Sequence, residues 1–391
     1  MKRRIQAAVV LCFAIMFTAL CIYRPIYIQN LENKINTDAI TEGITDIISN
    51  SDTSTDWKKN HPKVKGIYIT GPTAGTERME DIIQLINDTE LNAIVLDVKD
   101  DFGNVTFKMD NEMVQDTDAC IPYIPDIEAL LKELKDNNIY VIARIPCFKD
   151  PTLAKTYPEL GLRTLEGDPV TDASGNAWVN PCKTEVWDYI ISIASTCADL
   201  GFDEIQLDYV RFPVGQNAEN AYYSAPADDE HRQQYINEFL NTIVDTLHKK
   251  NIAVTADVFG TIIQSDQDSK HIGQNYVTLA QELDGLNPMI YPSHYASGEF
   301  GIDVPDAAPY ETVYASLQGS KNVLADVPED DCAVIRPWLQ AFTASWVEGY
   351  IEYDGNAIRK QIQGVYDAGY EEWILWSSKS TYSPDGLLKA E

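Results

Sequence analysis

Basic residues are scarce in this chain. Its 391 residues include 30 lysines and arginines against 60 aspartates and glutamates, which gives a formal net charge of −30. A surface this acidic repels phosphate backbones, so the composition predicts that no nucleic acid is bound. Neutral glycans and cationic ligands remain compatible with such a charge.

Residues that bind metals and cofactors are also few and scattered. The chain has five histidines and seven cysteines, without a CxxC pair or a Cys/His cluster, so we expect no metal site. The odd number of cysteines argues against a disulfide framework. The glycine spacing of a dinucleotide site is missing where it would be needed, at Thr70-Gly71-Pro72-Thr73-Ala74-Gly75, so no cofactor is expected.

Long apolar runs are missing except at the N-terminus. Residues 5–23 carry no charge and follow Lys2, Arg3 and Arg4. The run is about as long as a bilayer core requires, and its basic flank predicts that the N-terminus is cytoplasmic and the rest extracytoplasmic. We therefore expect residues 1–23 to form a cytoplasmic tip and a single transmembrane signal anchor. A cleaved signal peptide and a lipoprotein signal at Cys21 are the alternatives.

Residues 24–62 are predicted to be a spacer. They are polar and rich in Asn, Thr, Ser and Asp, and cannot bury enough apolar surface to fold alone. The spacer would hold a domain of residues 63–391 away from the membrane.

Apolar, β-branched runs alternate with segments of helical periodicity after residue 62. Strands are predicted at 64–70, 93–99, 140–146, 204–210, 253–259, 285–291, 334–340 and 371–377, and helices at 76–88, 125–137, 183–200, 230–250, 275–283, 309–320 and 356–369. Eight strand–helix units over this length predict an α/β fold, a (β/α)8 TIM barrel. A doubly wound open sheet is the rival fold, which would be favoured by a dinucleotide or phosphate motif.

Two predicted strands aim carboxylates at the same end of this barrel, where active sites of such barrels lie. Strict alternation along strand 204–210 predicts that Asp208, near its end, points to the barrel axis and that Tyr209 points to the helices. The same alternation predicts that Asp257 points to the barrel axis near the end of strand 253–259. A carboxylate pair is what glycoside hydrolysis requires. Arg211 is near enough in sequence to be the predicted partner that keeps Asp208 ionised.

Other polar and aromatic residues fall at the strand ends. Asp97 and Lys99 are predicted to form an internal pair that shapes the mouth, while Asp100 and Asp101 suit a turn and cap before Gly103. Flat rings for stacking and polar groups for hydroxyls are what a sugar site needs. The full set of predicted substrate-binding residues is Asp97, Lys99, Arg144, Arg211, Trp178, Asn180, Tyr291, His294, Trp338, Gln340 and Trp376.

Several runs resemble a family of bacterial glycoside hydrolases with a TIM-barrel domain, distantly similar to the α-amylase and α-galactosidase barrels. The runs are IVLDVKDDFG, IARIPCFKDP, WVNPCKTEVWDYI, GFDEIQLDYVRFP, NPMIYPSHY and WILWSS, and the resemblance covers about residues 62–391. DEIQLDYVRFP is its most specific part. The resemblance implies that Asp208, at the end of the fourth strand, is the nucleophile.

The acid/base position differs between those similar barrels, falling on strand five in one and strand six in the other. Asp257 matches the strand-five position, with Asp where amylases have Glu, whereas strand six offers only Tyr291 and His294. The resemblance thus implies hydrolysis of an O-glycosyl bond by Asp208 and Asp257, without a cofactor, on an undefined glycan.

The sequence therefore predicts a membrane-anchored extracellular glycoside hydrolase that acts on a polysaccharide or oligosaccharide. A barrel that binds glycans at the cell surface without cleaving them is the main alternative. A metal-dependent polysaccharide deacetylase would need an Asp and two convergent histidines, and only His294 of the five histidines lies at a strand end.

Overall fold

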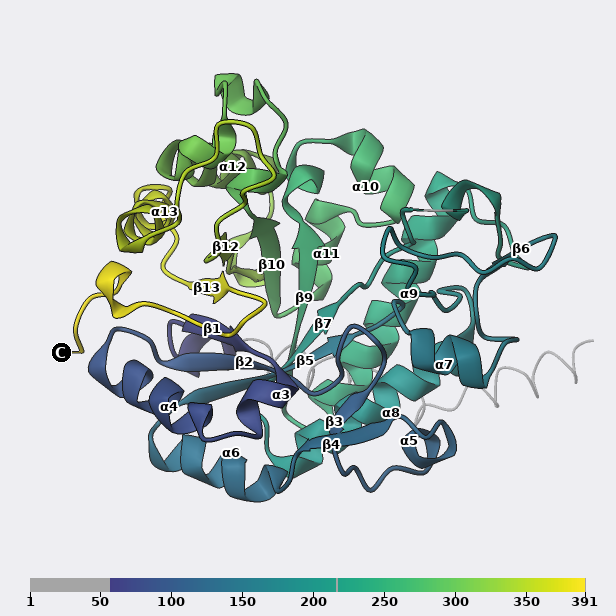
Figure 1. The fold of residues 1–391 in the computed structure, drawn as a ribbon. Coiled ribbons are helices and arrows are strands. Elements are labelled where there is room, and N and C mark those ends of the chain that lie inside the picture. Colours follow the sequence, from purple (N-terminus) through teal and green to yellow (C-terminus); the bar gives the residue numbers. More distant parts are fainter. Residues whose placement is uncertain (1–56, 216, 391) are drawn as a thin grey trace, which may run out of the picture. The chain divides into compact units, whose positions relative to one another are not determined.

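A closed ring of parallel strands forms the centre of the fold (Figure 1). The structure, a computed structural model, describes residues 57–215 and 217–390. The barrel strands are β1 (Lys65–Ile69), β2 (Ala93–Asp97), β5 (Tyr140–Pro146), β7 (Glu204–Asp208), β9 (Ala253–Phe259), β10 (Gly285–Ile290), β11 (Val334–Ile335) with β12 (Trp338–Gln340), and β13 (Trp373–Trp376). β1 pairs with both β2 and β13, which closes the ring.

The seventh position of the barrel is shared by two short strands. β10 pairs with β11 near its start and with β12 at its end. Pro337 lies between β11 and β12, and proline lacks the N–H group that a continuous ladder would use. Counted this way, the ring has eight positions, which confirms the predicted (β/α)8 barrel.

Seven helices that the sequence predicts cover the outside of the barrel (Figure 1). They are α4 (Arg78–Asp88), α6 (Ile127–Asp136), α8 (Thr184–Leu200), α9 (Asp229–His248), α11 (Tyr276–Glu282), α12 (Pro309–Val323) and α13 (Gly355–Asp367). Side-chain caps define several starts: Asp126 accepts a hydrogen bond from Ala129 N, and Asp354 accepts one from Ala357 N. Gly201 ends α8 with a φ of 90°, which favours glycine.

Shorter elements lie in the connections. They are α3 (Gly71–Ala74), β3 (Val105–Phe107), α5 (Glu112–Asp116), β4 (Cys120–Ile124), α7 (Pro151–Thr156), β6 (Arg163–Thr164), β8 (Ala221–Tyr222), α10 (Asp266–Ile272) and single 3₁₀ turns at 218–220, 260–263, 292–294, 299–301, 305–307, 329–331 and 384–386. β6 and β8 pair antiparallel and join the connections that follow β5 and β7.

Strand residues alternate between two buried layers. Ile94 and Leu96 of β2 belong to the large core under the helices, whereas Ala93 and Val95 belong to a smaller cluster. That cluster also contains Tyr68 from β1, so it fills the barrel interior. Burial on both faces explains why the strands read as nearly continuous apolar runs.

The barrel interior also contains a buried ionic network at the start of the strands. Arg336 is fully buried and pairs with Glu204 at 2.8 Å and with Glu372 at 2.9 Å. His61 Nε2 lies 2.7 Å from Glu372, and its ring stacks on Trp57. The folded unit thus includes residues 57–62, which the sequence analysis assigned to the spacer.

No helix among residues 57–215 and 217–390 is long and apolar enough to cross a membrane. The predicted anchor at residues 5–23 and most of the predicted spacer lie outside the described residues. The anchor therefore stays a prediction.

The contacts of residues 57–62 predict where the domain can be cut. A fragment that begins at Ser54, just before the first described residue, Trp57, should be fully stable. A fragment that begins at Lys63 should lose about 1–3 kcal/mol of unfolding free energy, because Trp57 no longer binds Tyr140 and Glu372 loses His61. Urea unfolding of both fragments measures this difference, and equal midpoints would contradict it.

Candidate active site

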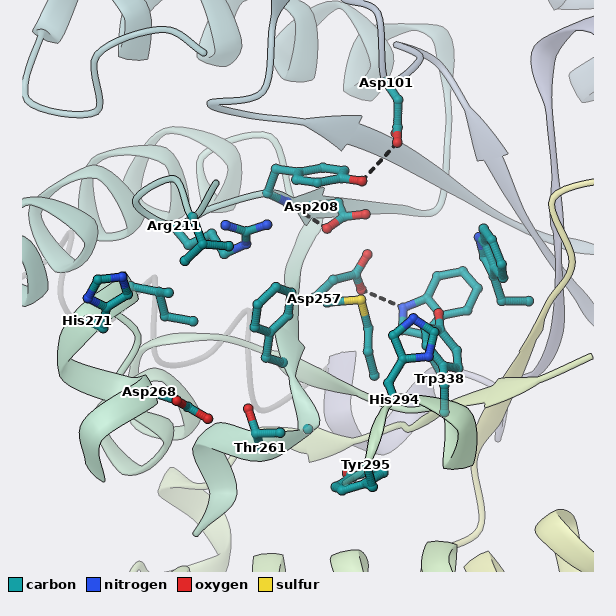
Figure 2. Close-up of a pocket in the computed structure, with 18 of the residues that line it drawn as sticks. Asp101, Asp208, Arg211, Asp257, Thr261, Asp268, His271, His294, Tyr295 and Trp338 are labelled. Carbon is teal, nitrogen blue, oxygen red and sulfur yellow. Dashed lines mark hydrogen bonds between the residues drawn. The ribbon is translucent and has the colours of Figure 1, made fainter. Parts of the chain in front are cut away.

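A cavity of about 580 Å³ opens at the carboxyl ends of the barrel strands (Figure 2). Asp208 and Asp257 both line it, on β7 and β9. The complete lining is Asp101, Arg144, Asp208, Tyr209, Arg211, Val214, Asp257, Phe259, Gly260, Thr261, Asp268, His271, Ile272, Met289, Tyr291, His294, Tyr295, Trp338 and Trp376.

The two carboxyl groups belong to the same layer of the barrel. β7 and β9 are neighbours, and Leu207 pairs with Ala256 in their register. One residue further along each strand places Asp208 beside Asp257, on strands that lie about 4.8 Å apart. Figure 2 shows both carboxyl groups directed into the cavity.

Arg144 connects three carboxylates at the mouth. It extends from β5, between β2 and β7, and donates to Asp208 Oδ2 from Nε at 3.0 Å and from Nη2 at 2.5 Å. It also donates to Asp97 at 2.6 Å and to Asp101 at 3.0 Å. Burial opposes a charge here, but Asp208 and Asp97 more than compensate and raise the pKa of Arg144 well above its usual value.

Arg211 is not the partner of Asp208, so that prediction is wrong. Its guanidinium donates to Phe212 O at 3.1 Å and lies over the rings of Phe259 and Trp178, at 4.4 and 4.8 Å from their centroids. Burial lowers the pKa of Arg211 to about 10. Proximity in sequence was misleading, because the chain turns between Asp208 and Arg211.

That turn is made at Tyr209. β7 ends at Asp208, and Tyr209 has a φ of 51°, a left-handed conformation that costs a non-glycine residue of order 1 kcal/mol. Tyr209 therefore breaks the alternation that predicted it to face the helices, and its ring lines the cavity instead. Its N–H donates to Asp208 Oδ1 at 2.6 Å, and its hydroxyl donates to Asp101 at 2.8 Å.

Asp257 makes no ion pair with a described residue. Its Oδ1 accepts from Trp338 Nε1 at 2.7 Å and from Asn287 Nδ2 at 3.2 Å. Its Oδ2 is buried and has no hydrogen-bond partner among the described residues. Burial and the nearby charge of Asp208 raise the pKa of Asp257 well above its usual value, so the protonated form of this carboxyl group is favoured.

Asp97 and Lys99 do not form the predicted pair. Asp97 lies beneath the cavity and accepts from Arg144 and from the Tyr68 hydroxyl, and burial raises its pKa to about 7 despite the charge of Arg144. Lys99 follows the end of β2 and turns away, where it is fully buried and pairs with Asp150 at 2.7 Å. Beyond the strand end, alternation no longer fixes the direction of a side chain.

The side chains of Asp100 and Asp101, which were predicted to form a turn and cap together, point to different places. Asp100 makes the predicted turn, because its Oδ1 accepts from Phe102 N and Asn104 N at 2.9 Å. Asp101 enters the cavity and accepts from Lys149 at 3.1 Å in addition to Arg144 and Tyr209. Burial alone would raise its pKa, but the charges of Arg144 and Lys149 lower the pKa of Asp101 to about 2.

Besides Asp97 and Lys99, three more predicted substrate contacts do not line the cavity. Trp178 is buried behind Tyr209, with ring centroids 5.8 Å apart. Asn180 donates to Tyr223 O at 2.9 Å, and Gln340 donates to Asp306 at 2.9 Å. These side chains hold loops in place. The predicted residues that do line the cavity are Arg144, Arg211, Tyr291, His294, Trp338 and Trp376.

Sequence reasoning missed several lining residues. Asp101 and Tyr209 adjoin strand ends that were recognised, so their position was a usable signal. Others come from β9 and β10 and from the connections that follow these strands, and they are Phe259, Thr261, Asp268, His271, Ile272, Met289 and Tyr295. Phe259 lies two residues after Asp257 on β9, so strand alternation could have identified it, whereas no spacing rule marks the residues of the connections.

Paired carboxylates at the mouth of a (β/α)8 barrel are typical of glycoside hydrolases. The model of a family described as "Putative glycosyl hydrolase domain" matches residues 66–382, so the chain belongs to this family. A hypothetical protein from Ruminiclostridium thermocellum is 35% identical over 49% of this chain and 97% of its own, with a TM-score of 0.44. Comparison with curated proteins finds no match.

More distant solved structures share the fold. The PgaB (BpsB) glycoside hydrolase domain from Bordetella bronchiseptica is 13% identical over 82% of this chain and 95% of its own, with a TM-score of 0.58. Catalytic domain 2 of the Group II chitinase from Ostrinia furnacalis is 11% identical over 82% and 91%, with a TM-score of 0.51. At these identities the likeness shows the barrel fold alone.

The buried acid at Asp257 predicts a pH-dependent stability. The folded state keeps this proton above pH 4, where the unfolded state loses it, so wild-type stability falls as pH rises toward the folded pKa. Asp257→Asn mimics the protonated acid and removes this slope, which is at most about 1.4 kcal/mol per pH unit. The stability gain of the variant over wild type should therefore grow as the pH rises above 4 and level off at the folded pKa of Asp257.

Denaturant unfolding at several pH values measures this gain. The pKa of Asp97, raised to about 7, also makes stability fall as the pH rises. Asp97 is present in both proteins, so its contribution cancels in the difference between them. A gain that stays constant with pH would show that Asp257 is ionised throughout.

Proposed function

We propose that this chain is a glycoside hydrolase that cleaves an O-glycosyl bond of a polysaccharide or oligosaccharide, with Asp208 as the nucleophile and Asp257 as the general acid and base. The observation that carries the proposal is the contrast between these neighbouring carboxyl groups. Asp208 is held by Arg144, whereas Asp257 is buried, has a pKa raised well above its usual value, and has an oxygen without a partner among the described residues.

This contrast matches the two roles that glycoside hydrolysis requires. Asp257 would donate its proton to the leaving oxygen of the glycosidic bond, while Asp208 attacks the anomeric carbon from the other side. A water molecule would then give its proton to Asp257 and hydrolyse the glycosyl–Asp208 ester. Neighbouring strands bring the two carboxyl groups close together, and a separation of about 5–5.5 Å between them would match this retaining route.

The surroundings of each carboxyl group support its role. Among the described residues, Asp208 Oδ1 accepts a hydrogen bond only from Tyr209 N, because Arg144 binds Oδ2, so Oδ1 is available to the substrate. Trp338 Nε1 is a neutral donor to Asp257 Oδ1, so it orients the acid without adding a positive charge that would ionise it. The proton is thus directed to Oδ2.

Substitution of the two aspartates should separate their roles. Asp208→Asn should abolish hydrolysis in a screen of polysaccharides and oligosaccharides, because an amide of the same shape cannot attack. Asp257→Asn should slow hydrolysis about 10²–10⁴-fold, but less on aryl glycosides whose leaving group needs little protonation. Wild-type kcat should fall at high pH as Asp257 loses its proton.

Circular dichroism of both variants is the control for folding. Full activity of Asp208→Asn on a glycan that the wild type cleaves would exclude it as nucleophile. Binding of a glycan without cleavage by the wild type would instead support a carbohydrate-binding barrel.

We also propose that residues 5–23 anchor the chain in the cell membrane and that the barrel acts outside it. The support is the basic flank at Lys2, Arg3 and Arg4 before the uncharged run. A protease added to intact bacteria that express the chain should cut the spacer and release the barrel. Release only after lysis would contradict this topology.

A further inference from the structure

A row of aromatic side chains leads out of the cavity to the surface. Tyr291 and Trp376 line the cavity, with ring centroids 5.8 Å apart. Phe342 contacts Trp376 edge to face at 5.3 Å, and Trp346 stacks on Phe342 at 6.0 Å with an interplanar angle of 16°. The row therefore ends at Trp346, whose side chain is 68% exposed.

The loop that presents Trp346 is firmly held. Asp306 is fully buried beneath it and accepts from Gln340 Nε2 at 2.9 Å and from Ile351 N at 3.3 Å. The backbone oxygen of Asp306 also accepts from the Tyr353 hydroxyl at 3.0 Å. The loop from 341 to 353 is thus fixed at both ends, and Trp346 is displayed on a pre-organised support.

We propose that the row Tyr291–Trp376–Phe342–Trp346 is a binding track for a glycan chain, so that the substrate is a polymer whose sugars extend from the cavity to Trp346. This inference rests on the proposed function and specifies its substrate class. A short oligosaccharide would fill the cavity without reaching Trp346. A long chain would continue along the row.

The chemistry of the row favours a glycan over other occupants. An indole face offers apolar contact to the C–H face of a sugar ring, while the sugar hydroxyls remain in water. The row is continuous with the cavity at Tyr291 and Trp376, so a chain that leaves the cavity on this side passes over it. One face of the Trp346 ring is covered by Phe342, and the other remains for a ligand.

The experiment measures glycan binding and cleavage separately, on the full-length chain in mild detergent. Binding of chito-, cello- and malto-oligosaccharides from disaccharides to long chains is measured with Asp208→Asn as the inactive background. Trp346→Leu should weaken binding of the long chains about fivefold to tenfold and leave the shortest bound oligosaccharide unaffected. Trp346→Phe, which keeps a flat ring, should restore most of the loss.

The matched control is Tyr222→Leu. Tyr222 is 54% exposed but lies on β8 and contacts no ring of the row, so its loss should leave the length dependence unchanged. Equal binding of long chains by Trp346→Leu and its parent would overturn the track. So would failure of every tested glycan to bind.

Cleavage by the chain with an intact Asp208 tests the proposed function independently. Suppose that binding depends on chain length and on Trp346, but no glycan is cleaved. This result would support the binding track and reject the hydrolase. Cleavage with a kcat/KM that depends neither on chain length nor on the Trp346→Leu substitution would support the hydrolase and reject the binding track. In a chain that supports both proposals, kcat/KM rises with length and Trp346→Leu removes that rise.

Discussion

The ion pairs of Arg144 are the constraint on which the mouth of this barrel depends. Asp97, Asp101 and Asp208 each contact the guanidinium of Arg144, and burying Asp97 and Asp208 without this cation would be costly. Its planar fork fixes Asp208 through two donors, which a lysine could not do. Because Arg144 points toward β2 and β7, Asp257 on β9 has only neutral hydrogen-bond donors, and burial with the charge of Asp208 raises its pKa well above its usual value. The position of one cation thus gives the two central carboxyl groups different surroundings.

The strained backbone at Tyr209 follows from the same arrangement. A left-handed residue directly after Asp208 lets the Tyr209 N–H bind the carboxylate while its hydroxyl reaches Asp101. Lys149 lies 4.6 Å from the centroid of the Tyr209 ring and also pairs with Asp101, so ring, cation and carboxylate support one another. These contacts compensate a conformational cost of order 1 kcal/mol. Strain of this kind is concentrated where side chains must be aimed.

The sequence predicts the barrel well because each strand and helix is a local pattern. Periodicity located every barrel strand and the inward direction of Asp208 and Asp257, since both lie within regular strands. The failures begin where the strands end. Arg211, Lys99 and Tyr209 all follow a final strand residue, and there the backbone turn, not the alternation, sets the direction of the side chain. Gln340 is different: it faces inward as expected, but its partner Asp306 comes from a distant loop that no local pattern identifies.

The cavity has an ionic side and an aromatic side, and this division suits a polymer substrate. Arg144, Asp101 and Lys149 lie together on the side of β2 and β5, whereas Tyr291, Trp338 and Trp376 come from β10, β12 and β13 or directly follow them. Aromatic groups are compatible with a protonated Asp257, because they exclude water and supply no cation that would ionise it. The same rings offer stacking surfaces that continue outward to Trp346. A chain held along the aromatic side would therefore lie against the acid, with the Arg144-bound Asp208 beside it at the neighbouring strand.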